Sequence, residues 1–80
     1  MKYHINISVK DGVLDPEMET LHRLLKRSGV KGIRKLNHTQ RFEIDFEEGY
    51  DEATAGRIAD AVARDVLANP EIHDWTIEKA

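Results

Sequence analysis

Four histidines are the side chains in this sequence best suited to bind a metal or carry a proton. They are His4, His22, His38 and His73. No two of them have the four-residue separation that places a pair of zinc ligands on one face of a helix. Cysteine is absent, so a metal site would need at least three histidines or carboxylates brought together by the fold. We therefore interpret the histidines as surface or interface residues and predict no metal site.

Carboxylates and hydroxyls are the next candidates for chemistry. Glu43, Asp45 and Glu47 alternate along one predicted strand face, where like charges could raise a pKa and suggest acid catalysis. No nucleophile or cation accompanies them, so we favour a solvated face that discourages edge pairing, or a docking face for a basic partner. Ser8 and Ser28 lack the context of a nucleophile elbow, and no glycine-rich phosphate loop is present. We therefore predict no catalytic residue in this chain.

The segment from residue 23 to residue 35 contains six cations and no acid. The cations are Arg23, Lys26, Arg27, Lys31, Arg34 and Lys35. Such a segment could contact RNA, a substrate phosphate or an acidic neighbouring subunit. The net charge of the whole chain is −3, which argues against a nucleic-acid binder. We therefore favour an acidic neighbouring subunit as the partner of this segment.

Size and composition limit how these residues can be supported. The chain has 80 residues, which predicts one domain over residues 1–80 with a thin hydrophobic core. Domains this small often need a disulfide, a metal or a second subunit, and without cysteine we expect a homo-oligomer. No run of 18 apolar residues and no signal peptide is visible, so we expect no membrane partner and a cytoplasmic location.

The first half of the sequence predicts a strand followed by a helix. Residues 3–9 alternate apolar and polar side chains, which is typical of a half-buried strand. After a break at Asp11-Gly12, Asp15 can cap a helix over 16–28, and Pro16 suits its first position. Gly29 is a favourable residue at which to end that helix.

The second half predicts two strands, a helix and a final strand. The segment 32–48 is either a hairpin turning near 37–40 or one long bent ribbon, and its clearest strand alternates Phe42, Ile44 and Phe46 with acids. Asp51 can cap a second helix, which Asn69-Pro70 ends because a residue before proline avoids the helical region. A last strand over 72–78 contains Trp75.

Together these elements predict an α+β fold in the order β-α-β-β-α-β. An antiparallel sheet with both helices on one face is the economical way to bury two amphipathic helices and alternating strands. Such a sheet has free edges and one open face, and we expect a second copy of the chain to cover them.

Two stretches resemble the PurS family. One stretch follows the first strand and the other closes the chain. They read Lys10-Asp11-Gly12-Val13-Leu14-Asp15-Pro16 and Val66-Leu67-Ala68-Asn69-Pro70-Glu71-Ile72-His73-Asp74-Trp75-Thr76-Ile77. The resemblance extends to the length of the chain and to the order of its elements. It implies a PurS-like oligomer, with Gly12, Asp15, Pro16, Asn69, Pro70 and Trp75 as candidate contact residues.

PurS is the small subunit of phosphoribosylformylglycinamidine (FGAM) synthase, so the resemblance also implies a function. That enzyme converts formylglycinamide ribonucleotide (FGAR) to FGAM, with ATP and ammonia from glutamine. A PurL-type large subunit carries the ATP-dependent chemistry, and a PurQ-type glutaminase makes the ammonia. The implied role of this chain is non-catalytic: it would bridge these two subunits as a dimer or tetramer and assist ammonia transfer. The complex would use ATP, Mg²⁺ and glutamine, while this chain would bind no cofactor.

One departure from the family pattern bears on partner binding. Relatives usually carry an Arg-x-Gly-Lys stretch before the Phe-Glu-Leu strand, whereas this chain has Asn37-His38-Thr39-Gln40 followed by Arg41. Arg41 is therefore a further candidate contact residue, and the chain could bind its partners differently or be a divergent paralogue. The alternative function is a stand-alone dimeric regulatory or ligand-binding domain with a ferredoxin-like layout.

Overall fold

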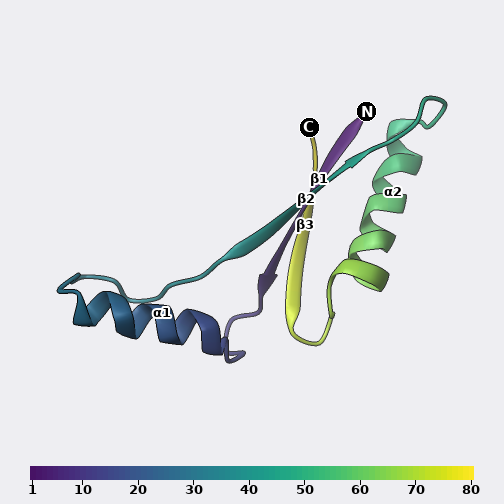
Figure 1. Ribbon diagram of the computed structural model, residues 1–80. Helices are drawn as coiled ribbons and strands as arrows, with labels where there is room; N and C mark the ends of the chain where they lie inside the picture. The colour runs from purple at the N-terminus through teal and green to yellow at the C-terminus, as the bar shows by residue number, and fades with distance from the viewer.

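A computed structural model describes all residues from 1 to 80. Its elements are three strands, two α-helices and one π-helical turn. In chain order they are β1 (Lys2–Val9), α1 (Pro16–Arg27), β2 (Thr39–Asp45), α2 (Glu52–Val62), η1 (Ala63–Leu67) and β3 (His73–Lys79). The molecule is elongated, with extents of 53 × 24 × 15 Å. Figure 1 shows α1 projecting beyond the strands while α2 lies alongside them.

The three strands form one antiparallel sheet in the order β2-β1-β3. The register places Ile5 between Phe42 and Ile77, so apolar side chains from all three strands share one face. The opposite face is polar along its whole length. At its centre, for example, Asn6 lies between Arg41 and Thr76. The alternation in each strand therefore separates a face for packing from a face for water.

The core lies between the apolar sheet face and α2. Tyr3, Ile5 and Ile7 of β1 are buried against three alanines spaced four residues apart, Ala55, Ala59 and Ala63. Four-residue spacing places the alanines on one side of the helix, and their small side chains let it approach the sheet closely. Trp75 Nε1 donates a hydrogen bond to Asp60 Oδ1 at 2.9 Å and ties β3 to α2.

Helix α1 is defined by local signals and has little cover from the rest of the chain. Asp15 caps its start by accepting a hydrogen bond from the Met18 backbone N–H, and Pro16 occupies the first turn. Its end is a Schellman motif, in which Gly29, at φ +87°, and Val30 donate to the Lys26 and Leu25 carbonyls. Met18 is the only buried residue of this helix.

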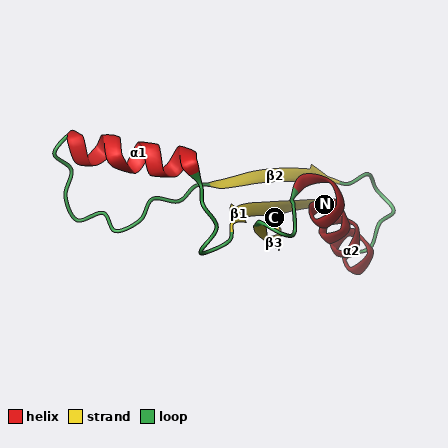
Figure 2. Cartoon of the chain, turned by 90° about the horizontal axis from the view of Figure 1, so that it is seen from below, coloured by secondary structure: helices red, strands yellow, loops and turns green.

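The antiparallel sheet and the α+β class are confirmed, but two predicted features differ in the structure. The expected strand in the first part of 32–48 is absent, because residues 30–38 run back along α1 without pairing to the sheet. Ile33 and Leu36 are three residues apart, a spacing that does not match the alternation of a strand. The expectation of both helices on one face was also wrong, since only α2 packs on the sheet (Figure 2). No helix is long and apolar enough to cross a membrane.

Candidate functional site

The two motifs of the sequence meet at one end of the sheet. The Lys10 backbone N–H, which follows β1, donates to the Ile72 carbonyl at 2.8 Å. The turn before β3 is closed by the Asn69 carbonyl, which accepts from the backbone N–H groups of Ile72 and His73 at 3.0 and 2.8 Å. Pro70 lies within that turn, where it lacks an N–H to leave unsatisfied. Segments about 60 residues apart in sequence thus form one structural unit.

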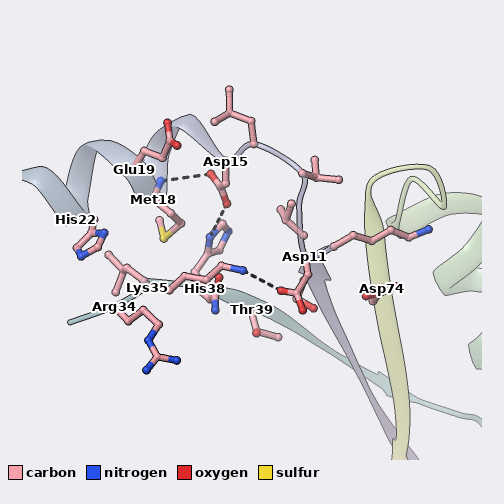
Figure 3. Close-up of a pocket in the computed structure, with 17 residues that line it drawn as sticks. Asp11, Asp15, Met18, Glu19, His22, Arg34, Lys35, His38, Thr39 and Asp74 are labelled. Carbon is pink, nitrogen blue, oxygen red and sulfur yellow. Dashed lines mark hydrogen bonds and ion pairs between the residues drawn. The ribbon is translucent and has the colours of Figure 1, made fainter. Parts of the chain in front are cut away.

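A groove of about 460 Å³ lies beside this unit, between the start of α1 and the returning segment 34–39. Figure 3 shows the polar side chains that line it. Asp15 uses both carboxylate oxygens there: Oδ1 accepts from the Met18 backbone N–H at 3.3 Å, and Oδ2 lies 3.6 Å from His38 Nδ1. The residue that caps α1 therefore also contacts the segment that returns to the sheet.

Two more polar contacts close the groove. Lys35 Nζ donates to Asp11 Oδ1 at 2.8 Å, and this hydrogen bond and the Lys35 charge hold the pKa of the Asp11 carboxyl below its usual value. Further along α1, His22 Nε2 lies 2.9 Å from the Ile33 carbonyl oxygen. Three contacts of this kind connect segment 30–38 to α1 and to the loop before it, and we refer to residues 16–38 as the arm.

The seven candidate residues do not form a single site. Gly12, at φ +82°, makes the turn before α1, while Asp15 and Pro16 begin that helix at the groove. Pro70 and Trp75 line a second, shallow hollow at the same end of the sheet, next to the Asn69 turn.

Arg41 is separate from the other six candidates, on the polar sheet face. It contacts His4 Nδ1, and its Nη2 lies 3.8 Å from Glu78 Oε2. Sequence reasoning did not find the Asp11–Lys35 and Asp15–His38 contacts, because both depend on the path of the unpaired segment 30–38. No repeating pattern marks that path.

The groove is lined by a mixture of charged, polar and apolar side chains. Acids and bases are mixed in its lining, and Ser8 and Thr39 supply the only side-chain hydroxyls. Glu19 lies one turn before His22 on α1, a spacing found in some metal sites, but no group of three His, Asp or Glu side chains is placed to hold a metal ion. The arrangement can hold a polar polypeptide segment by hydrogen bonds and charge.

Comparison with known proteins decides the family. The model for PurS, described as phosphoribosylformylglycinamidine (FGAM) synthase, matches residues 2–80. The chain belongs to the PurS family. This confirms the resemblance seen in the two motifs. PurS is a subunit of FGAM synthase in purine biosynthesis, so the alternative of a stand-alone ligand-binding domain is not favoured.

Relatives of known name and structure agree with this assignment. The PurS subunit of phosphoribosylformylglycinamidine synthase from Archaeoglobus fulgidus is 34% identical over 73 residues, which are 91% of this chain and 90% of that protein. The crystal structure of PurS from Methanocaldococcus jannaschii, one of the subunits of formylglycinamide ribonucleotide amidotransferase, has a TM-score of 0.80. It is 31% identical, and the match covers 96% of this chain and 92% of that chain.

A larger assembly contains a chain of the same fold. The structure of PurLQS from Thermotoga maritima matches with a TM-score of 0.76 and 22% identity, covering 99% of this PurS chain and 95% of that chain. At this identity the match supports the fold alone.

Proposed function

We propose that this chain is the non-catalytic assembly subunit of an FGAM synthase. It joins a PurL-type large subunit to a PurQ-type glutaminase, associates with further copies of itself, and assists the transfer of ammonia between the two active sites. The observation that carries the proposal is the family match over residues 2–80. The groove supports a binding role, because it offers a surface in which acidic and basic side chains are mixed.

The shape of the chain favours the same role. The molecule is 53 Å long and only 15 Å thick, so it presents a large surface for its size. Four leucine and valine side chains of the arm and of the loop before it are at least 40% exposed. They are Leu14, Leu21, Leu24 and Val30. Exposed apolar residues next to polar contacts are typical of protein interfaces. In this proposal ATP, Mg²⁺ and glutamine bind to the other subunits, and the complex works in the cytoplasm.

Reconstitution tests the proposal directly. The chain would be mixed with the PurL-type and PurQ-type subunits of its own organism, with glutamine and Mg-ADP present, and the mixture separated by size. We expect co-elution of all three proteins. We also expect FGAM formation from glutamine to require this chain, while formation from added ammonia by the large subunit continues without it. A chain that elutes alone and leaves the glutamine-dependent rate unchanged contradicts the proposal.

Arg41 offers a sharper test of partner contact. Replacing Arg41 with Ala removes an exposed cation from the polar sheet face, whereas Arg57→Ala removes an exposed cation from α2 that forms no ion pair. If the polar face contacts a partner subunit, Arg41→Ala weakens assembly and Arg57→Ala does not. Equal retention of both variants in the complex would remove Arg41 from the list of contact residues.

A further inference from the structure

We propose that Asp11 is a site of chemical modification, at which the main chain isomerises through a cyclic imide to isoaspartate. The reaction uses only the Asp11 carboxyl group, the Gly12 backbone N–H and water. A contact from Lys35, in the returning segment of the arm, restrains it. This chemistry is independent of the assembly role, because it takes place within one turn of a single chain.

Asp11 is the only aspartate of the chain that is followed by glycine. Without a Cβ, glycine lets its backbone nitrogen approach the preceding carboxyl group closely. Asp15 precedes a proline, whose nitrogen carries no proton to lose, and Asp51 is held as the cap of α2. The other aspartates lie within strands or helical segments, which fix the backbone on both sides of them. They are Asp45, Asp60, Asp65 and Asp74.

The turn that contains Asp11 is exposed and loosely packed. The Val13 backbone N–H donates to the Lys10 carbonyl at 3.2 Å, so Asp11 and Gly12 are the central residues of a β-turn. Gly12 has φ +82° and Asp11 does not have a positive φ, a combination that defines a type II turn. The Asp11 side chain is 97% exposed, and a Cβ at Gly12 would meet no atom within 4 Å. The peptide group between the two residues therefore meets little steric resistance to rotation.

Rotation of that peptide group brings the Gly12 nitrogen to Cγ of Asp11. In a type II turn the first central residue has ψ of about +120°, which directs this nitrogen away from Cγ. When the two atoms meet, the N–Cγ bond forms and the Cγ–OH bond breaks, and the hydroxyl group and the amide proton leave as water. Water then opens the ring. Attack at Cγ restores aspartate, whereas attack at the Asp11 main-chain carbonyl carbon breaks the original peptide bond and leaves isoaspartate, with no oxidation or reduction.

Lys35 restrains ring closure in two ways. Its Nζ donates to Asp11 Oδ1 at 2.8 Å and so holds the carboxyl group towards the returning segment (Figure 3). The same hydrogen bond and the Lys35 charge hold the pKa of the Asp11 carboxyl below its usual value, which keeps the group ionised. An ionised carboxylate repels the nitrogen lone pair and lacks the hydroxyl group that leaves as water. Ring closure therefore proceeds from the conformation in which Lys35 has released Asp11.

Isomerisation changes the loop that leads into the arm. The isoaspartyl main chain runs through Cβ and Cγ, so it gains one atom between Lys10 and Gly12, and its carboxylate is attached directly to Cα. Both changes alter the turn that is closed by the Lys10 carbonyl and move the carboxylate away from Lys35. The modification should therefore remove one of the three contacts that connect segment 30–38 to α1 and to the loop before it.

Ageing the purified full-length chain tests the proposal. Samples held at constant pH and physiological temperature would be digested with an endoproteinase that cleaves before aspartate but not before isoaspartate. Mass spectrometry would then measure the resistant fraction at each aspartate over time. We expect resistance at Asp11 to accumulate at least about tenfold faster than at Asp51, which is also exposed but remains a helix cap and is followed by a residue with a Cβ. Equal rates at the two positions overturn the proposal.

Three variants test the roles of glycine and lysine. Lys35→Gln should raise the rate at Asp11 by about threefold, the size expected from losing an exposed ion pair. Lys31→Gln removes an exposed cation without an ion pair from the same segment and should leave the rate unchanged. Gly12→Asn keeps a residue that tolerates positive φ but places a Cβ beside the nitrogen, so it should lower the rate by about tenfold. Equal rates with and without the Lys35 amine, or no decrease with Gly12→Asn, contradict the proposal.

Discussion

The body and the arm of this protein are stabilised in different ways. The body, made of the sheet with α2 and η1, contains six of the seven buried residues. The arm contains only Met18 of that set, and side-chain hydrogen bonds and charge contacts hold its returning segment in place. Burial of apolar surface dominates folding energetics, so the body must supply most of the stability of the single chain. The arm is shaped mainly by its own local sequence and is available for contacts with other molecules.

Local helix signals are correspondingly more complete in α1 than in α2. Helix α1 has an N-cap, a first-turn proline, acids in the first turn, bases in the last turn and a glycine-ended Schellman motif. Helix α2 has its cap at Asp51 but no base in its last turn, and it passes into the π-helical turn η1 instead of stopping at a glycine. A helix packed against a sheet needs fewer of these signals, since tertiary contacts stabilise it.

The largest contrast should come from truncating one apolar side chain in each region. Ile5 is fully buried at the centre of the sheet, so Ile5→Ala should reduce the free energy of unfolding by about 2–5 kcal/mol. Leu24→Ala, in the arm, should change the free energy of unfolding of the dissociated chain by less than about 0.5 kcal/mol. Urea denaturation in dilute protein measures both. If Ile5→Ala does not fold, Ile5→Val should show a loss of about 1 kcal/mol. Similar losses for Ile5→Val and Leu24→Ala would mean that the arm is part of the core.

Helix bounds followed from the sequence because they depend on neighbouring residues. The Asp15-Pro16 start and the Gly29 stop placed α1 within a residue of its observed end. The position of α1 in space did not follow, because an amphipathic pattern shows that a face needs cover without showing what covers it. The groove was equally hidden: Asp11 and Lys35 are 24 residues apart, and neither belongs to a helix or strand. The meeting of the two motifs was not predicted either, because it depends on the antiparallel pairing of β1 with β3, and the alternation within a strand does not show which strand is its neighbour.

Two glycine substitutions should act in opposite directions in the two regions. Gly29 has φ +87°, a backbone conformation that strains any residue with a Cβ, and a Cβ there would meet no atom within 4 Å. Gly29→Ala should therefore reduce the free energy of unfolding of the arm by about 1–2 kcal/mol, through backbone strain and not through a steric clash. Gly56 lies inside α2, where a Cβ would make ordinary contacts with the Tyr3 hydroxyl oxygen at 3.7 Å and with a ring carbon of Tyr3 at 3.9 Å. Gly56→Ala should therefore stabilise the body by about 0.5–1 kcal/mol.

Hydrogen exchange separates the two glycine effects by location. Gly29→Ala should speed exchange of the α1 amides by roughly fivefold or more and leave the β1 amides unchanged, because the arm opens without the body. Gly56→Ala should slow exchange of β1 and α2 together. If Gly29→Ala also speeds β1 exchange, the arm and the body unfold as one unit, and the distinction between them is lost.

The smallest expected effect concerns two carboxyl groups, one in each region. The pKa of Asp51 is lowered by the hydrogen bond from the Thr54 backbone N–H at the start of α2, and that of Asp11 by the hydrogen bond from Lys35. Both folded pKa values lie below the ordinary value of 3.8. Each contact therefore stabilises the fold above that pH and is lost as the pH falls through the folded value.

Lys35→Gln should separate these two groups. In a carboxyl-detected NMR titration, the substitution should return the pKa of Asp11 towards its ordinary value and leave Asp51 unchanged. The matched control is Lys10→Gln, because Lys10 lines the same groove and forms no ion pair. The donor to Asp51 belongs to the same helix turn and persists while α2 is folded, whereas the donor to Asp11 reaches it from the returning segment of the arm. The pKa of Asp11 therefore reports whether the returning segment of the arm contacts the loop before α1. Identical Asp11 titrations with and without Lys35 would show that the Lys35–Asp11 contact does not form in solution.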